Sequence, residues 1–217
     1  MLREKIDKKI IPKHFHVTIF GSSRIKKNDF VYKQVYILAQ MIGEKNIDVI
    51  TGGGPGIMEA ANSGHKSGVK KRNHDAHSIG LGIKLPHEQK FNESVQLYKK
   101  FDKFSRRLDN FMLMSNAIVV APGGIGTLLE LFYTWQLMQV KRICNIPFIL
   151  LGKQWKPFME WMEKYPLKQK YFEKVDLDLV FLADDCYEAI KIIDKAHKHW
   201  KKGGKDFCLN YKKYKLK

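Results

Sequence analysis

The stretch AIVVAPGGIGTLLE, residues 117–130, joins three kinds of sequence within fourteen positions. Its first four residues are apolar and mostly β-branched, as in a strand that is buried on both faces. A proline and three glycines follow, and they predict a tight turn that no bulky side chain obstructs. From Thr127 to about residue 140 the apolar residues recur with helical spacing. The stretch therefore predicts one strand–turn–helix unit of an α/β fold.

The same alternation of strand and helix runs along the whole chain of 217 residues. Short apolar runs predict strands at 16–20, 47–50, 78–85, 117–120, 147–151 and 180–183. Apolar periodicity predicts helices at 29–45, 55–67, 101–115, 127–140, 156–164 and 184–197. Several strands are continuously apolar, which indicates a parallel sheet with helices on both faces. We therefore predict a single Rossmann-like α/β domain over residues 1–217, with a short basic segment at about 1–13 and a basic tail at about 198–217.

The composition is typical of a globular protein in a reducing compartment. Hydrophobic residues make up 44% of the chain, and no apolar run approaches the ~18 residues that cross a bilayer. The basic N-terminus lacks the apolar core of a signal peptide. Three widely spaced cysteines, Cys144, Cys186 and Cys208, indicate neither a disulfide framework nor a metal site. A cytoplasmic protein without membrane contact is expected.

The formal net charge of +17 raises the alternative of nucleic-acid binding. Ten lysines and two aspartates lie between Lys191 and Lys217, so nearly half of the excess belongs to the tail. Aromatic residues alternate with these lysines, and such a tail can bind phosphates. No nucleic-acid-binding motif accompanies the charge, which favours a solvated tail over a nucleic-acid contact. The charge should also attract small anions to a cleft.

Three predicted strands end in glycine or small polar residues, in the segments GSSR, TGGGPGIM and APGGIGT. In a parallel sheet these ends lie on one edge, where ligands of open α/β sheets bind. Glycine lets backbone N–H groups approach an anion, and a helix N-terminus adds unpaired donors. Thr127 can cap the following helix or donate its hydroxyl to a phosphate. The candidate ligand-binding residues are Gly21, Ser22, Gly52, Gly53, Gly54, Met58, Gly123, Gly124, Gly126 and Thr127.

A carboxylate, Glu130, follows one helical turn after the last glycine loop. A phosphate would be repelled by it, so we expect Glu130 to face the sugar end of a nucleotide. There a carboxylate can stabilise an oxocarbenium-like centre or position a water. The basic counterpart is one of the adjacent residues Arg106 and Arg107, because neighbours on a helix point in different directions.

Four segments follow one another as in the LOG ("lonely guy") family of phosphoribohydrolases, whose members were often described as lysine decarboxylases. These segments are TGGGPGIMEAAN (51–62), GIKLPHEQKFN (82–92), SRRLDNFM (105–112) and PGGIGTLLE (122–130). The chain resembles this family from about Val17 to about Ala189, and the pairing of GGGxGxM with PGGxGTxxE makes the resemblance specific. It implies a Rossmann-like fold and a homodimer. It also implies hydrolysis of the N-glycosidic bond of a nucleoside 5'-monophosphate, giving a free base and ribose 5-phosphate.

The resemblance also implies roles for particular residues. The arginine fifteen positions before the proline of PGG, here Arg107, and the glutamate that closes the motif, here Glu130, would be catalytic. The PGG loop would bind the phosphate, and Glu88 in LPHEQ would contact the substrate. No metal and no cofactor is implied. An AMP-like nucleotide or a cytokinin riboside monophosphate is the expected substrate.

Three positions depart from the family pattern, namely Leu108 after the arginine, Leu129 before the glutamate, and Gln136 six residues beyond it. We expect them in or near the substrate shell, where they would affect the choice of base. An alternative that the sequence leaves open is a non-catalytic nucleotide or molybdenum-cofactor carrier on the same fold. His74 and His77 form an HxxH pattern, but without further ligands of a known motif a surface loop is favoured.

Overall fold

The computed structural model describes residues 4–5, 14–84 and 90–202. Within these residues all strands join one parallel sheet, in the order β1-β5-β4-β3-β2-β6-β7-β8. The strands are β1 (Glu4–Lys5), β2 (His16–Phe20), β3 (Asp48–Thr51), β4 (Ser78–Ile83), β5 (Leu97–Phe101), β6 (Ala117–Val120), β7 (Phe148–Leu151) and β8 (Val180–Ala183). The strand order reverses between β2 and β6, as in Rossmann-like folds. The predicted α/β fold is confirmed.

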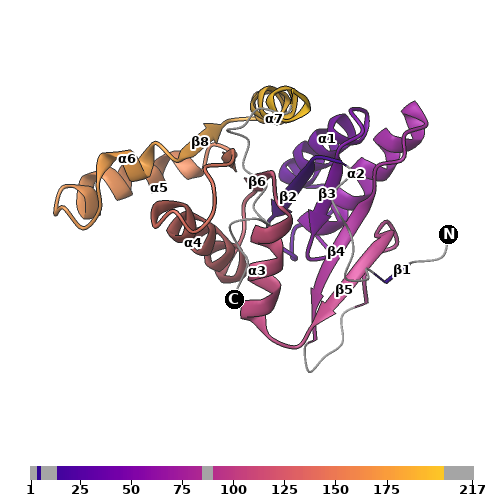
Figure 1. Ribbon diagram of the computed structural model, residues 1–217, viewed down its shortest axis with the longest axis horizontal. Helices are drawn as coiled ribbons and strands as arrows, with labels where there is room; N and C mark the ends of the chain where they lie inside the picture. Colours follow the sequence, from indigo (N-terminus) through magenta and orange to yellow (C-terminus); the bar gives the residue numbers. More distant parts are fainter. Residues whose placement is uncertain (1–3, 6–13, 85–89, 203–217) are drawn as a thin grey trace.

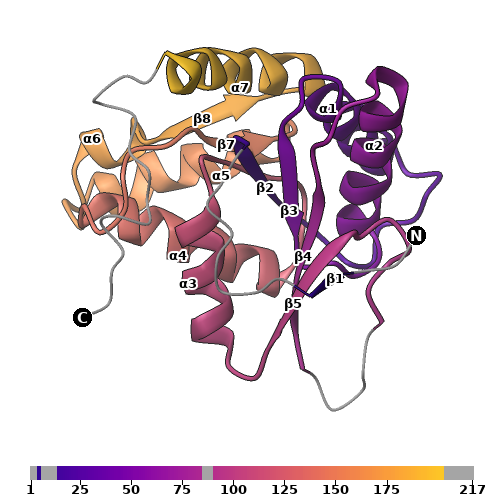
Figure 2. The same cartoon turned by 45° about the vertical axis from the view of Figure 1, so that its right-hand side comes forward.

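Helices cover both faces of the sheet (Figures 1 and 2). One face carries α1 (Phe30–Gly43), α2 (Ile57–Arg72) and α7 (Cys186–Lys201). The other carries α3 (Phe104–Met114), α4 (Ile125–Gln139) and α5 (Trp155–Met162), and α6 (Lys174–Leu177) lies beyond them. A short π-helix, η1 (Glu163–Leu167), extends α5. Among the described residues, no helix is long and apolar enough to cross a membrane.

Two apolar cores follow from the period-two alternation of the strands. In β6, Ala117 and Val119 pack under α1 and α7, whereas Ile118 and Val120 pack under α3 and α4. All four side chains are fully buried. This two-sided burial explains why the central strands read as continuous apolar runs. It also fixes β2 and β6 rigidly at the point where the strand order reverses.

Helix α2 extends to Arg72, five residues beyond the predicted end, although it contains Gly64 and Gly68. These glycines lie against α1. A Cβ on Gly64 would overlap the backbone of Tyr36, and one on Gly68 would overlap the carbonyl of Gln40. The glycines therefore allow the two helices to approach closely and do not end the helix.

The sequence reading missed strand β5 and gave several boundaries imprecisely. β5 reads LYKKF, and its two central lysines conceal it within an otherwise polar segment. It pairs with β4 over five residues and ends at Phe101, the residue at which a helix was predicted to begin. Helix α3 starts three residues later, at Phe104. The predicted end of the third strand, at residue 85, lies outside the described residues, as does most of the N-terminal segment and of the basic tail.

Candidate active site

The loops after β2, β3 and β6 meet at the carboxyl edge of the sheet and border a cavity of about 560 Å³. The cavity lies at the reversal of strand order, where parallel α/β sheets bind their ligands. The first loop begins at Gly21. The second, the GGG loop, spans residues 52–56, and the third, the PGG loop, spans residues 121–124. The expectation that the three strand ends share one edge is confirmed.

The GGG loop is held by a hydrogen-bond network that includes the buried residues Thr51 and Asn62. Asn92 donates through Nδ2 to the carbonyls of Gly53 (3.1 Å) and Gly54 (2.9 Å) and to Oδ1 of Asn62 (2.9 Å). The hydroxyl of Thr51 donates to the same Asn62 oxygen and accepts the N–H of Gly53. These bonds satisfy backbone groups of Gly53 and Gly54 on the side of the loop where Asn92 and Thr51 lie. Gly52, Gly53 and Gly54 also line the cavity.

An aromatic ring that the sequence analysis did not single out lies under the same loop. Phe91 lines the cavity, and its ring occupies the space that a Cβ would take on Gly53, Gly80 and Gly82. Gly80 and Gly82 alternate along β4 and therefore leave one face of that strand bare. Glycines at alternating strand positions were the sequence signal for such a close approach.

Helix α4 directs its N-terminus toward the cavity. The helix begins at Ile125, so Thr127 is its third residue and does not cap it, and the capping residue Gly124 makes no side-chain cap bond. The possibility that Thr127 caps the helix is therefore wrong. Gly124, Ile125, Gly126 and Thr127 all line the cavity. The first-turn N–H groups and the positive end of the helix dipole together form an arrangement that suits an anion.

Arg107 and Glu130 form an ion pair at the wall of the cavity. Arg107 Nη1 lies 3.6 Å from Glu130 Oε1, and each side chain is only 12% exposed. Arg107 also donates through Nε to the carbonyl of Leu81 (2.8 Å), and its guanidinium lies 5.1 Å from the ring centroid of Phe111. These contacts fix the guanidinium plane. Arg106, its neighbour, is exposed and lies outside the cavity.

Burial dominates the electrostatics of this pair. It raises the pKa of Glu130 to about 7, although the positive charge of Arg107 opposes the shift. Burial also lowers the pKa of Arg107, while Glu130 acts in the opposite direction. Arginine stays charged at any working pH, so the pair holds one fixed cation beside a carboxyl that titrates near neutrality.

Three further cations line the cavity, namely Arg24, Lys90 and Lys100, and the sequence analysis identified none of them. Glu130 is the one carboxylate among the described lining residues. With Arg107, these side chains give the cavity a positive potential. Arg24 closes the GSSR segment, Lys90 lies in the segment 82–92 and Lys100 lies in β5. At none of these positions did the sequence distinguish the residue from the many other basic residues.

The structure brings together most of the residues that the sequence analysis proposed. Those that line the cavity are Gly21, Ser22, Gly52, Gly53, Gly54, Met58, Arg107, Gly124, Gly126, Thr127 and Glu130. Gly123 does not line it. This residue lies against the side chain of Thr127, which leaves no room for a Cβ. Glu88 lies outside the described residues.

The expectation that the three departures lie in the substrate shell is not supported by the described lining. Leu108 is buried on the inner face of α3, and only 5% of it is exposed. Leu129 and Gln136 are exposed on α4, and Gln136 donates to Gln139. All three are absent from the described cavity wall. In α4, the helical rotation that turns Glu130 toward the cavity turns Leu129 and Gln136 away from it.

Fold and site together define a Rossmann-like α/β protein with a basic, glycine-rimmed cavity at the reversal of strand order. The chain belongs to the family described as possible lysine decarboxylase, whose model matches residues 58–193. This is the LOG family, so the resemblance carried by the glycine motifs is confirmed. The family match covers α2 to α7 and includes both Arg107 and Glu130.

One similar protein is the pyrimidine/purine nucleotide 5'-monophosphate nucleosidase of Escherichia coli K12, which is 27% identical over 144 residues. The match covers 63% of this chain but only 30% of that protein. Among solved structures, the molybdenum cofactor binding protein of Rippkaea orientalis is 21% identical with a TM-score of 0.61, over 85% of this chain and 98% of that one. The molybdenum cofactor carrier protein of Chlamydomonas reinhardtii is also 21% identical, with a TM-score of 0.60, over 85% of this chain and 98% of that one. At these identities the two structures show a shared fold.

Proposed function

We propose that this protein hydrolyses the N-glycosidic bond of a nucleoside 5'-monophosphate. Water would add its hydroxyl to C1' of the ribose, and its proton would leave with the base. The products are a free base and ribose 5-phosphate. The observation that carries the proposal is the buried pair of Arg107 and Glu130 beside a helix N-terminus that suits a phosphate.

The phosphate would lie at the start of α4. The open amides of its first turn and the hydroxyl of Thr127 offer donors, and Arg24, Lys90 and Lys100 supply positive charge around the cavity. Gly124 and Gly126 present no side chain there, and a Cβ on either would meet no atom within 4 Å. The surface is therefore open enough for a phosphate to approach the backbone.

Glu130 would act on the sugar. Cleavage of an N-glycosidic bond passes through a cationic, oxocarbenium-like sugar, which an adjacent carboxylate stabilises. The same carboxylate can accept a proton from the attacking water. Its pKa of about 7 suits this role, because the ionised form is populated at neutral pH while the carboxylate remains basic. Arg107 would hold the carboxylate in place and orient the substrate.

The choice of base is the finer part of the proposal. AMP is our first candidate, and the relative from Escherichia coli is named for both pyrimidine and purine nucleotides. A panel of purine and pyrimidine monophosphates, with a cytokinin riboside monophosphate included, would establish the preference. Free base is separated and quantified by chromatography, and ribose 5-phosphate is measured in parallel.

Matched variants test the chemistry. Glu130→Gln keeps the shape of the side chain and removes its charge, so we expect kcat to fall by about 10²–10⁴-fold. Arg107→Ala should lower kcat/KM comparably, whereas Arg106→Ala, one residue away and exposed, should leave it unchanged. Glu160→Gln, an exposed position of α5, controls for loss of a carboxylate.

If wild type cleaves no nucleotide faster than an Arg107→Ala, Glu130→Ala double variant, the protein is not this enzyme. Tight nucleotide or molybdenum-cofactor binding without turnover would point to a carrier.

We also infer that the protein acts as a homodimer. Ile125, Leu129 and Phe132 are exposed, 83%, 46% and 44% respectively, and their spacing places them along one side of α4. A second copy would cover this apolar stripe, which starts at the cavity because Ile125 lines it. Sedimentation velocity of wild type and of Phe132→Glu tests the inference. A wild-type monomer at micromolar concentration would contradict it.

A further inference from the structure

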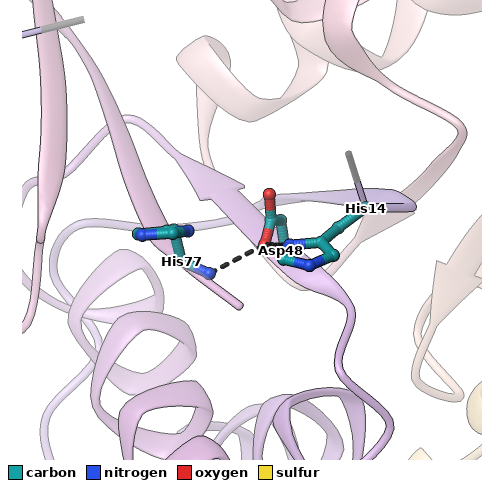
Figure 3. Close-up of side chains that lie close together, drawn as sticks. All are labelled: His14, Asp48 and His77. Atoms are coloured by element: carbon teal, nitrogen blue, oxygen red, sulfur yellow. Dashed lines mark hydrogen bonds and ion pairs between the residues drawn. The ribbon is translucent and has the colours of Figure 1, made fainter. Parts of the chain in front are cut away.

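A second group of titratable side chains lies at the opposite edge of the sheet. His14 precedes β2, Asp48 begins β3, and His77 immediately precedes β4. Because the strands are parallel, their starts share the edge remote from the cavity. Asp48 lies between His14 and His77 (Figure 3). Strands of four to six residues separate this cluster from the cavity by about 15 Å, at ~3.3 Å for each residue.

The imidazole of His14 faces a carboxylate oxygen on each side. Its Nδ1 lies 3.0 Å from Asp48 Oδ1, and its Nε2 lies 3.2 Å from Asp75 Oδ1. Both carboxylate oxygens are acceptors, whereas a neutral imidazole donates through only one nitrogen. When Nε2–H donates to Asp75, the lone pair of Nδ1 points at Asp48. A cation between these two atoms makes that contact favourable.

His16 has the same surroundings. Its Nε2 lies 3.1 Å from Asp48 Oδ2, and its Nδ1 lies 2.9 Å from the carbonyl oxygen of Met114. Both of these neighbours are acceptors as well. His14 and His16 are buried, with 9% and 1% exposed, so bulk water does not complete the set. The cluster thus concentrates lone pairs around Asp48.

His77 completes a set of ligands of the type that transition metals prefer. Its backbone N–H donates to Asp48 Oδ1 (2.7 Å), which fixes the residue beside the carboxylate. Its half-buried ring lies 6.5 Å from the ring of His14, centroid to centroid, with 24° between the planes. One nitrogen of each ring and one oxygen of Asp48 all lie within 4.8 Å of one another.

We propose that His14, Asp48 and His77 bind one divalent metal ion of the zinc class, with water as a fourth ligand. Two imidazoles and a carboxylate suit Zn²⁺, Co²⁺ or Ni²⁺ better than Mg²⁺ or Ca²⁺. Tetrahedral bonds of about 2.0–2.1 Å place donor atoms roughly 3.3 Å apart. His14 Nδ1 and Asp48 Oδ1, 3.0 Å apart, are close to this spacing, and a rotation of the His77 side chain would supply the third donor, which already lies within 4.8 Å of the other two.

Asp75 would support the site from behind. A metal-bound imidazole usually donates its other N–H to a carboxylate, which fixes its tautomer and strengthens the bond. The contact between His14 Nε2 and Asp75 Oδ1 has this geometry. The ion would join the starts of β2 and β3 to the segment before β4. It would therefore act on stability and take no part in the reaction at the other edge.

Binding of Co²⁺ and Zn²⁺ to the full chain tests the proposal, after chelator treatment and removal of any histidine tag. We expect one Co²⁺ per chain, with the visible absorption of a four-coordinate ion, and displacement by Zn²⁺. His77→Ala should weaken binding at least tenfold, and Asp75→Asn by about 10–100-fold. His74→Ala is the matched control, because its ring contacts the carbonyl of Gly43 and lies outside the cluster.

A second readout is thermal stability. Zn²⁺ at a hundredfold excess over its Kd should raise Tm for wild type and His74→Ala but not for His77→Ala. His77 is half-buried, and none of the hydrogen bonds found in the described part of the chain involves its ring, so His77→Ala should fold normally. Failure of wild type to bind Co²⁺ or Zn²⁺ at millimolar concentration would overturn the proposal. Equal binding by wild type and His77→Ala would also overturn it.

Discussion

In the GGG loop Gly52, Gly53 and Gly56 each face a close neighbour, whereas in the PGG loop Gly123 faces Thr127 and Gly124 faces open space. A Cβ on Gly52 would meet Arg107 and the sulfur of Met58, one on Gly53 would meet the ring of Phe91, and one on Gly56 would meet the backbone of Ser22 and Ser23. The space beside Gly124 is open to 4 Å, as is that beside Gly126 at the start of α4. Glycines in the first loop therefore serve the packing of the chain. Those near the start of α4 leave room for a ligand.

The two loops also hold different halves of the candidate site. The GGG loop lies over the guanidinium of Arg107, and the PGG loop leads into the helix that carries Glu130. Changes in the first loop should therefore affect folding first, and changes after the second should affect substrate binding first. The following predictions are ordered from the largest expected effect to the smallest.

Gly53→Ala should lower the free energy of unfolding by about 2–4 kcal/mol. Gly53 has a φ of 75°, a left-handed conformation that favours glycine, and a Cβ there would overlap the ring of Phe91. Urea denaturation measures the change. The double variant Gly53→Ala, Phe91→Ala removes the overlap and should recover part of the loss beyond additivity. An unchanged free energy of unfolding in Gly53→Ala would mean that the loop is not packed as described.

Asn92→Ala should lower the free energy of unfolding by about 1.5–3 kcal/mol. The substitution removes the bonds from Asn92 Nδ2 to Gly53, Gly54 and Asn62 and the bond that Asn92 Oδ1 accepts from the N–H of Ser94. The oxygen of Asn62 and the carbonyl of Gly53 each lose one of their two donors. Asn110→Ala, at a half-buried position of α3 whose amide donates to the carbonyl of Arg106 within the same helix, is a control for loss of an amide side chain. A change smaller than that of the control would contradict the role of the network.

The next prediction is the pH dependence of activity, which concerns Glu130 on the helix after the PGG loop. If the ionised Glu130 is required, kcat/KM should rise about tenfold between pH 6 and pH 8, because the pKa of Glu130 is about 7. The remaining activity of Glu130→Gln should lack this step. A profile that falls over this range would mean that the protonated form is the active one.

The same shift gives a dependence of stability on pH with a defined sign. The folded-state pKa of Glu130 lies above its ordinary value of 4.5, so the folded state binds the proton more tightly. The stability that Glu130 contributes by binding this proton is fully present below about pH 4.5 and is lost as the pH rises through about 7. Thermal melts of wild type and Glu130→Gln across this range should therefore diverge, with wild type losing more stability toward pH 8.

Gly126→Ala should have the smallest effect on the fold and the opposite sign. The position is helical and has open space around it, so alanine should stabilise α4 by about 0.5–1 kcal/mol. The added methyl group would nevertheless occupy the surface at the start of α4 where the phosphate is proposed to bind, and it should therefore raise KM for the nucleotide. A variant that is more stable but binds substrate more weakly would support the distinction between the packed glycines of the GGG loop and the open glycines near the start of α4. Unchanged KM would place the phosphate elsewhere.

The sequence was sufficient for the central sheet because β2, β3, β6 and β7 are buried on both faces and therefore read as apolar runs. It was insufficient for β5, whose central lysines are half-exposed. In the site, Arg107 and the glycine loops belong to motifs and were found. Phe91 lies in the family segment 82–92 but at a position to which the sequence analysis assigned no role, and Lys100 reaches the cavity from β5, which has no motif. The cluster of His14, Asp48 and His77 was missed because only the parallel pairing of the strands brings these residues together.

The reversal of strand order between β2 and β6 also bears on how the protein folds. Their pairing brings His16 beside Asn116, one hundred residues along the chain, whereas β2, β3 and β4 join through single helices. Closing so long a loop is entropically slow, so we expect the N-terminal strands to assemble with α1 and α2 before β6 docks. The cavity spans this junction. A nascent chain would therefore acquire this cavity only in the last stage of folding, which would make ligand binding a measure of completed folding.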